Sequence, residues 1–197
     1  MYYMANLTKK DKAFLVRLAR SVIEAALDAG QKEALPDDVS PAVLRKGGCF
    51  VTLHKQGALR GCIGTIEPIQ ALVEGVEENA INAAFKDPRF SSLTIEELPD
   101  IDLEVSVLTV PQKLTFKDPE DLKRQLKPGI HGVILSSGWR RSTFLPQVWD
   151  QLPDPELFLR HLCEKAGLHR DCWRDPETVV EVYEATYFSE GAISAKL

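Results

Sequence analysis

The sequence predicts an α+β protein, in which helices cover an antiparallel sheet built from hairpins. Segments of alternating apolar and polar residues come as adjacent pairs separated by short turns, at residues 49–66 and 131–145, and such pairs are typical of hairpins. Segments with apolar residues at helical spacing interrupt these pairs. A doubly wound parallel sheet would instead alternate single strands with helices, so the antiparallel class is favoured.

The composition is that of a globular protein with a core of its own. The chain has 197 residues, of which 44% are hydrophobic and 27% charged, and its formal net charge is −5. This length predicts one domain over residues 1–197, or two closely packed subdomains. A chain of this size buries enough apolar surface to fold without a metal or a disulfide.

The first predicted element is a helix over residues 8–29. Thr8 and Asp11 have the spacing of a capping box, and Gly30 is a typical stop. A polar connector follows, and a short helix is predicted over residues 40–47. The helical spacing of the first element is carried by Leu7, Phe14, Leu15, Leu18, Val22, Ile23 and Ala26.

Residues 49–66 predict two strands around a turn at residues 56–58. Pairing Lys55 with Leu59 sorts the side chains, because directly opposed residues share a face of the sheet. A register slipped by one residue, with a two-residue turn, would place Arg60 among apolar neighbours and is disfavoured. In the preferred register one face carries Val51, Leu53, Leu59 and Ile63, and the other carries Phe50, Thr52, His54, Arg60 and Cys62.

The rest of the chain predicts further helices and strands. A helix over residues 68–86 ends at Asp87 and Pro88. A strand over residues 101–107 alternates apolar with polar residues, so that Glu104 projects from the face opposite the core. The remaining predicted elements are a short helix after Thr94, a helix after Asp118, a hairpin around Ser137 and Gly138, a helix from Asp154 to Ala166 and a strand over residues 178–188.

The sequence disfavours membrane, secreted and nucleic-acid-binding classes. Residues 1–12 contain no apolar stretch of signal-peptide length, and no later segment approaches the roughly 18 apolar residues of a membrane span. The acidic charge balance opposes the phosphate contacts that dominate nucleic-acid binding. We therefore expect a soluble, cytoplasmic protein without nucleic acid or membrane as partner.

The four cysteines predict reduced thiols and no metal site. They are too few for a disulfide framework, and none has Cys-x-x-Cys spacing. Cys49 and Cys163 fall on apolar faces and are predicted in the core. A zinc site of Cys163, His169 and Cys172 matches no common pattern. The chain also lacks a dinucleotide fingerprint, a P-loop and a radical SAM cysteine cluster, so no cofactor is expected.

The segment 60–64, Arg-Gly-Cys-Ile-Gly, is the strongest candidate for chemistry. Gly61 and Gly64 lie within a predicted strand, where glycine marks a bulge or a close approach of the backbone to another group. Cys62 lies between them, and the neighbouring cation Arg60 would favour a thiolate. The alternative is that Cys62 packs as a small hydrophobic residue.

Three further residues are candidates for supporting roles. Arg89 follows a helix end, where it could join Arg60 in binding a carboxylate or phosphate, or pair locally with Asp87. Glu104 could act as a general base or pair with an arginine, although a strand glutamate is most often solvated. His131 could titrate near neutral pH, or make a hydrogen bond that stabilises a turn.

The segment Leu59 to Gly64 resembles the signature of the AMMECR domain family, called AmmeMemoRadiSam system protein A in prokaryotes. The resemblance continues in order along nearly the whole chain. It extends over Cys49 to Leu53, Asp87 to Phe90, Glu104 to Leu108, Gly129 to Gly132, Phe144 to Val148 and Lys165 to Leu168.

The resemblance implies a fold of two subdomains on an antiparallel, barrel-like sheet with helices outside. It also implies a Memo-like protein and a radical SAM protein as partners, and a site around the Arg-Gly-Cys segment with no assigned reaction. The candidate catalytic residues are Cys62, Glu104 and His131, and the candidate substrate-binding residues are Arg60, Gly61, Gly64 and Arg89.

Three hypotheses of function follow. The protein is a component of a modification system with these partners, a cysteine-dependent enzyme acting on an anionic small molecule, or a non-catalytic interaction module. The enzyme hypothesis predicts a Cys62 pKa below the usual 8.5 or so, whereas the interaction module predicts a buried, unreactive thiol.

Overall fold

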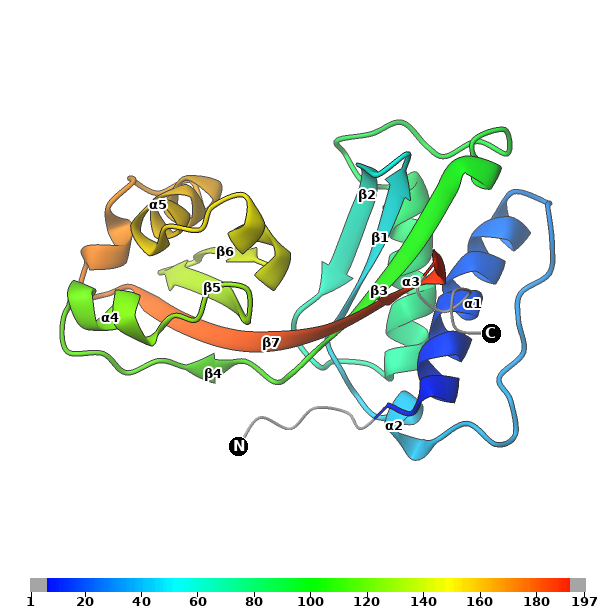
Figure 1. Ribbon diagram of the computed structural model, residues 1–197, viewed down its shortest axis with the longest axis horizontal. Coiled ribbons are helices and arrows are strands. Elements are labelled where there is room, and N and C mark those ends of the chain that lie inside the picture. The colour runs from blue at the N-terminus through cyan, green and yellow to red at the C-terminus, as the bar shows by residue number, and fades with distance from the viewer. Residues whose placement is uncertain (1–6, 192–197) are drawn as a thin grey trace. The chain divides into compact units, whose positions relative to one another are not determined.

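The computed structural model describes residues 7–191 and has the α+β architecture predicted from the sequence (Figure 1). The described chain divides into two compact units, residues 7–110 with 186–191, and residues 111–185. The two ends of the single domain predicted over residues 1–197 lie outside the described residues. No described helix has the length and apolar character needed to cross a lipid bilayer.

In the first unit, two helices cover one face of an antiparallel sheet with strand order β2-β1-β3. The first helix begins at the predicted capping box. There the Asp11 N–H donates to the Thr8 hydroxyl oxygen, and the Thr8 N–H donates to the Asp11 carboxylate. The elements are α1 (Lys9–Ala26), α2 (Pro41–Leu44), β1 (Cys49–Lys55), β2 (Ala58–Thr65), α3 (Leu72–Phe85), the 3-10 helix η1 (Leu98–Asp100), β3 (Ile101–Leu108) and the last residues of β7 (Val179–Ser189).

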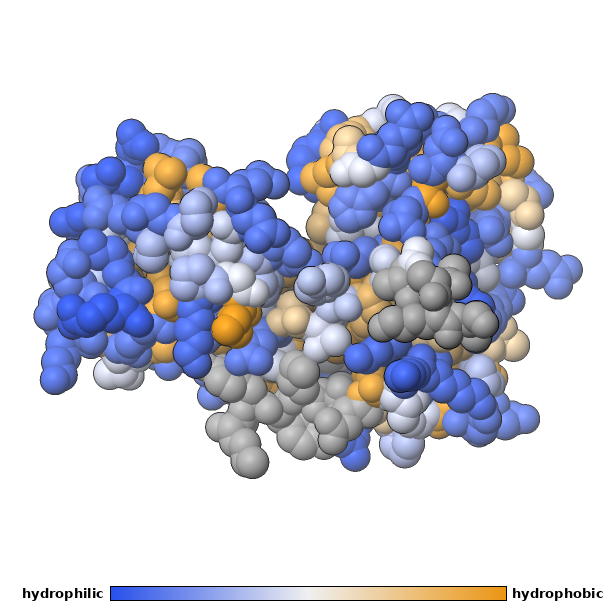
Figure 2. All heavy atoms as spheres, viewed as in Figure 1, coloured by the Kyte–Doolittle hydropathy of each residue, from blue (hydrophilic) through white to orange (hydrophobic). Residues whose placement is uncertain are grey.

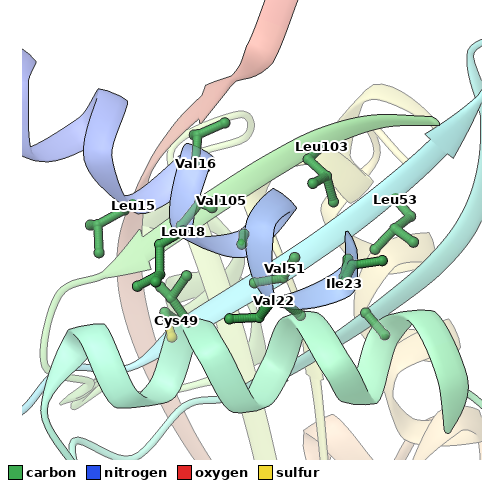
Figure 3. Packing of buried hydrophobic residues seen from close by; sticks show 14 of the residues in the cluster. Leu15, Val16, Leu18, Val22, Ile23, Cys49, Val51, Leu53, Leu103 and Val105 are labelled. Carbon is green, nitrogen blue, oxygen red and sulfur yellow. The ribbon is translucent and has the colours of Figure 1, made fainter. Parts of the chain in front are cut away.

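The core of the first unit lies between this sheet and the two helices. Figure 3 shows side chains of α1, β1 and β3 pointing toward one another, among them Leu18, Val51 and Val105. Each of these three is 1% exposed or less. Complete burial of one such side chain stabilises the fold by about 1.5–3 kcal/mol. The alternating apolar residues of β1 and β3 therefore face the helices, and the polar residues between them project from the opposite face of the sheet.

The second unit has a separate core. Its strands follow the order β7-β5-β6, and the two residues of β4 pair with β7. Trp149 stacks on Phe158 with 3.7 Å between ring centroids. The elements are β4 (Gln112–Lys113), α4 (Pro119–Gln125), β5 (His131–Ser137), β6 (Arg140–Phe144), the 3-10 helix η2 (Pro146–Asp150), α5 (Pro155–Lys165), the 3-10 helix η3 (Cys172–Arg174) and β7.

Two predicted helices are shorter in the structure. The helix predicted from residue 68 begins at Leu72, because the preceding residues pair with the segment before β1. There the Gly47 N–H donates to the Gln70 carbonyl (3.2 Å) and the Leu72 N–H donates to the Arg45 carbonyl (2.9 Å). The helix predicted after Thr94 is limited to a turn and the short η1.

The prediction of four reduced thiols is wrong for one pair. Cys163 and Cys172 form a disulfide with 5.9 Å between their Cα atoms. Helix α5 ends after Cys163, Gly167 reverses the chain at a φ of 70°, and η3 then brings Cys172 back over the last helical turn. The burial predicted for Cys163 is confirmed, because its exposed fraction is 0%.

The surface is dominated by hydrophilic side chains. On the face shown in Figure 2, hydrophobic residues form small separate patches among charged and polar ones. The exposed large hydrophobic residues of the described chain are spread over both units, as Ile69 and Trp139 illustrate. Scattered residues of this kind are normal on a protein surface, so charged and polar groups are the more informative guide to a site.

Candidate functional site

The β1–β2 hairpin positions Cys62 opposite Thr52, in the register predicted from the sequence. Closer to the tip, a β-bulge shifts the register by one residue. The chain then reverses through Gln56 and Gly57, whose φ values are 52° and 79°. The hairpin thus combines the predicted register in its body with the disfavoured two-residue turn at its tip. Arg60 is the extra residue that the bulge accommodates.

Cys62 belongs to a row of residues that crosses the three strands. Thr52 of β1 lies opposite Cys62 of β2 on one side and opposite Glu104 of β3 on the other. Directly opposed residues project from the same face of a sheet. The neighbouring positions Val51 and Leu53 are in the core, so the cross-strand row Cys62, Thr52 and Glu104 projects from the face opposite the helices.

The Cys62 thiol is only partly exposed and stays protonated at neutral pH. Burial raises the pKa of Cys62 above its ordinary value. The Thr52 hydroxyl, which donates to Sγ over 3.3 Å, and the charge of Arg89 oppose this rise without cancelling it. The direction is contrary to the lowered pKa that the enzyme hypothesis predicts, because desolvation of the thiolate outweighs its stabilising contacts.

The Asp87 carboxylate organises the backbone and the cation next to Cys62. It is 4% exposed and accepts hydrogen bonds from the Cys62 N–H (2.9 Å) and from the Arg89 N–H (3.1 Å). The Arg89 guanidinium donates to both carboxylate oxygens, from Nε at 2.9 Å and from Nη2 at 2.6 Å. These bonds hold the pKa of Asp87 far below its usual range, with the Arg89 side chain as the largest cause. The local ion pair considered in the sequence analysis is therefore confirmed.

Together, the two side chains bind the outer edge of β2. This strand lies at the end of the sheet, so one side of its backbone has no neighbouring strand within residues 7–191. Asp87 accepts the Cys62 N–H, and Arg89 Nη2 donates to the Cys62 carbonyl oxygen over 3.2 Å. The pair of side chains thus makes the two hydrogen bonds that another antiparallel strand would make there. It fixes Cys62 and Arg89 relative to each other.

Arg60 is directed to a different set of partners. Its guanidinium binds the Glu97 carboxylate at 3.2 and 2.9 Å and the Ser91 carbonyl oxygen at 2.9 Å. Hydrogen bonds from Arg60 and Lys55 lower the pKa of Glu97 to about 2. Its position in the bulge explains this arrangement, because a bulge redirects the side chain of the extra residue. Arg89 rather than Arg60 is the guanidinium bonded to Cys62.

The two arginines predicted to share an anion site meet only at an aromatic ring. The guanidinium carbons of Arg60 and Arg89 lie 5.8 and 5.5 Å from the centroid of the Phe90 ring. Arg60 is 9% exposed and forms an ion pair with Glu97, whereas the Arg89 side chain is 54% exposed. Of the two cations, Arg89 is the one open to a ligand.

Gly61 and Gly64 are glycines for reasons of packing. A Cβ atom at Gly61 would collide with the carbonyl oxygen of Ala83 in α3, and one at Gly64 would collide with the Phe50 ring. The close approach predicted for a glycine-bearing strand is confirmed at both positions. Their predicted role in substrate binding stays a prediction.

His131 lies in the second unit, where it forms part of a local backbone network. Its Nδ1 accepts a hydrogen bond from the Lys127 N–H (3.3 Å), and its carbonyl oxygen accepts one from Trp149 Nε1 (2.7 Å). The turn-stabilising bond considered as an alternative is therefore confirmed. Burial lowers the pKa of His131, whose exposed fraction is 2%.

Sequence reasoning missed how much of the site depends on Asp87 and Thr52. The spacing of Asp87 and Arg89 offered a signal, because a carboxylate two residues before an arginine can bind both its backbone and its side chain. The Thr52 contact follows from the correct register. Among residues 7–191, no cluster of three histidine, cysteine or acidic side chains is arranged to hold a metal ion.

The chain is similar to proteins from several archaea over almost its whole length. It is 44% identical to a protein of Methanothermobacter thermautotrophicus, covering 94% of this chain and 97% of that protein. It is 43% identical to a protein of Methanocaldococcus jannaschii, covering 95% and 94%. The crystal structure of an uncharacterized protein from Pyrococcus horikoshii matches with a TM-score of 0.86 and 42% identity, covering 93% of each chain. A model of the AMMECR1 family matches residues 16–188, and the chain therefore belongs to the AMMECR1 family.

Proposed function

We propose that this protein is a cytoplasmic component of a modification system that also contains a Memo-like protein and a radical SAM protein. Its own contribution is a site for an anionic small molecule at Arg89, beside the Cys62 thiol. The first part of the proposal draws on the family resemblance. The second draws on the arrangement of Asp87, Arg89 and Cys62.

The observation that carries the anion site is the fixed position of the exposed Arg89 guanidinium. Asp87 accepts from Nε and Nη2, while Nη1 has no hydrogen-bond partner among the described residues. A guanidinium presents its donors in one plane, so Nη1 offers two N–H groups to a carboxylate or phosphate without reorganising. Preorganisation of this kind lowers the entropy cost of binding.

A cysteine-dependent reaction at the same place is a second candidate, favoured by the hydrogen bond from Thr52 to Sγ. A hydroxyl that donates to sulfur stabilises the thiolate relative to the thiol. Since burial keeps the pKa of Cys62 high, the proton must leave to a group that the substrate or a partner supplies. A buried thiol that never reacts is instead the expectation of the interaction-module hypothesis.

Binding of small anions tests the site directly. We would titrate succinate and inorganic phosphate into the protein by isothermal calorimetry at low salt, and compare Arg89→Gln with Arg17→Gln. Arg17 is an exposed arginine paired with Glu33 and serves as the matched control. We expect at least tenfold weaker binding for Arg89→Gln and no change for Arg17→Gln. Equal affinities for all three proteins, with folding verified by circular dichroism, would overturn the proposed site.

Thiol labelling separates the roles of Cys62. Iodoacetamide labelling of the folded protein between about pH 5 and 9, read by mass spectrometry, follows the thiolate alone. We expect Cys62 to label slowly and only at the alkaline end, and to label faster at neutral pH when the substrate or partner is bound. No acceleration by either partner protein would leave the non-catalytic module as the better description.

Association with the partners is tested by mixing the purified proteins. The Memo-like and radical SAM proteins of the same genome should co-elute with this protein in size-exclusion chromatography. Absence of any complex by this method and by calorimetry would contradict the system assignment while leaving the anion site intact.

A further inference from the structure

We propose that the ligand of this sheet face is a dipolar, peptide-like molecule, which lies across the strands with its carboxylate on Arg89 and its ammonium group at Glu104. This inference rests on the proposed anion site at Arg89. It adds a second contact at Glu104, the orientation of the ligand across the strands and the length of the ligand. It concerns only residues of the first unit.

The first argument is the order of charges across the sheet. Arg89 lies at the outer edge of β2, where it binds the Cys62 backbone. Cys62, Thr52 and Glu104 then follow on β2, β1 and β3. A cation therefore stands at one end of the line and a carboxylate at the other. The exposed Asp102, two residues before Glu104 on the same strand face, adds negative charge to the second end.

The thiol lies between these two charges and senses both. The charge of Arg89 stabilises the thiolate of Cys62, whereas the charges of Asp87 and Glu104 destabilise it. A molecule with one negative and one positive end would be aligned by this field in a single direction, because the reverse orientation would place like charges together. Its backbone would then pass over Cys62 and Thr52, with the carboxylate end nearer to the thiol.

The spacing of the strands sets the length of the molecule. Neighbouring strands are about 4.8 Å apart, so Cys62 and Glu104, two strands apart, are separated by roughly 10 Å. An extended peptide spans about 3.3–3.6 Å per residue. Arg89 lies on the outer side of Cys62, so the ligand must span at least this distance. A tripeptide is the shortest peptide with this reach, whereas a single amino acid, with both charged groups on one Cα atom, is too short.

An unpaired buried hydroxyl on the same face points independently to a ligand. Ser106 lies two residues after Glu104, on the same strand face, and is 1% exposed. Its Oγ has no hydrogen-bond partner among the described residues. Buried polar groups without partners are rare and costly. A peptide group would supply the missing bond once binding opens the way to this Oγ, which is closed to solvent in the structure.

Glu104 is able to receive an ammonium group in addition to the contacts that it already makes. A carboxylate has two oxygens and accepts about four hydrogen bonds. Thr52 is nearly buried, and its hydroxyl is committed to Cys62. The charged contacts of the ligand therefore fall on the two ends of the line.

Three matched peptides test the inference by calorimetry: triglycine, N-acetyl-triglycine and triglycinamide. We expect triglycine to bind at least tenfold more tightly than either blocked peptide. Glu104→Gln should weaken triglycine by about tenfold and leave N-acetyl-triglycine unchanged, because the blocked peptide has no ammonium group to lose. Asp37→Asn, in the loop between α1 and α2, removes an exposed acidic residue and is the control.

The outcomes distinguish this inference from the proposed function. Equal binding of triglycine and N-acetyl-triglycine, both lost in Arg89→Gln, would overturn the dipolar ligand and keep the anion site. Binding of succinate through Arg89, with no binding of any peptide, would likewise overturn the dipolar ligand and keep the anion site. If neither succinate nor any peptide depends on Arg89, both proposals are wrong. Urea unfolding of Glu104→Gln and Glu104→Asp verifies that a lost affinity is not a lost fold.

Discussion

Asp87 does more for the candidate site than any residue singled out by its chemistry. A single buried carboxylate orients the Cys62 backbone, the Arg89 backbone and the Arg89 guanidinium. The Arg89 guanidinium also contacts the Cys62 carbonyl oxygen and the Phe90 ring, but its ion pair, through two of its nitrogens, is with Asp87. Substitution of Asp87 therefore affects both folding and ligand binding.

We expect Asp87→Asn to destabilise the protein by about 2–3 kcal/mol at pH 7, since hydrogen bonds to a charged group contribute about 1.5–3 kcal/mol. The folded pKa of Asp87 is depressed, so this stability is present above the unfolded value near 3.9 and is lost as pH falls below it. Urea unfolding at pH 7 and pH 3 should show the difference between wild type and variant shrinking in acid. Glu33→Gln, which removes an exposed ion pair with Arg17, should change little at either pH. A difference independent of pH would contradict the role of the charge.

Burial of His131 predicts a second dependence of stability on pH, over a different pH range. Burial lowers its folded pKa below the unfolded value of about 6.5. The unfolded chain therefore takes up the proton first, and stability that is fully present above about pH 6.5 declines as the pH falls through this value. We expect the free energy of unfolding of wild type, measured in urea, to fall between pH 7 and 5, with a contribution from His131 of at most about 1.4 kcal/mol per pH unit. His131→Gln should flatten this segment, and the surface variant His161→Gln should not. A wild-type stability that changes as little between pH 7 and 5 as that of His131→Gln would contradict the prediction.

At the scale of residues, the sequence predicted the surroundings of Cys62 in part and misplaced Arg60. Two of the candidate residues, Cys62 and Arg89, do lie together. Arg60 was expected next to the thiol because strand geometry places residues two apart on one face. The bulge breaks that rule and sends Arg60 to Glu97. The position of a bulge depends on the partner strand and on the turn together. The pattern of residues along one strand contains neither.

Among the secondary-structure elements, β2 packs closely against α3. The backbone of Gly61 lies against the carbonyl oxygen of Ala83, near the C-terminal end of α3. The same helix ends just before Asp87. The close packing of these two elements therefore brings the Asp87 carboxylate within reach of the Cys62 backbone.

Gly61→Ala should be among the most disruptive small substitutions in the chain. The added methyl group has no space, and overpacking of this kind costs typically 1–3 kcal/mol. Gly57→Asn is the matched control, because Gly57 has a φ of 79° and open space around it, and asparagine tolerates this conformation. We expect a large loss of stability in urea for the first variant and a small one for the second. Ala83→Gly should not rescue Gly61→Ala, because the contact is with backbone; a rescue would contradict the steric explanation.

The helices and long strands were predictable because each has a strong apolar period. The boundaries were less so, since α3 begins where pairing with residues 45–47 ends. Leu59, predicted on the apolar face, is 43% exposed because the hairpin tip follows the slipped register. The two-residue β4 has no period at all, and it exists only because β7 offers an edge to pair with.

At the scale of the whole molecule, the chain holds two separate cores, and only the second is cross-linked. The disulfide joins residues nine apart within residues 111–185. It was not predictable from spacing, because two cysteines so far apart meet only if the chain reverses at Gly167.

Removal of the disulfide should act locally. We expect Cys163→Ala/Cys172→Ala to lose about 2–4 kcal/mol of stability, the usual contribution of one disulfide. Hydrogen exchange read by mass spectrometry should accelerate in α5 and β5 and stay unchanged in α1 and α3. Cys49→Ala, which alters a buried thiol of the first core, should show the opposite pattern. Uniform acceleration in both variants would mean that the two cores open together.

The side chains of Asp87 and Arg89 also have a consequence for solubility. An uncovered strand edge is a template on which a second molecule can add its own strand, and this is a common route to aggregation. At Cys62 the template is already occupied by two side chains of the same chain. The feature that positions the thiol and the guanidinium thereby also keeps one molecule from recruiting the next.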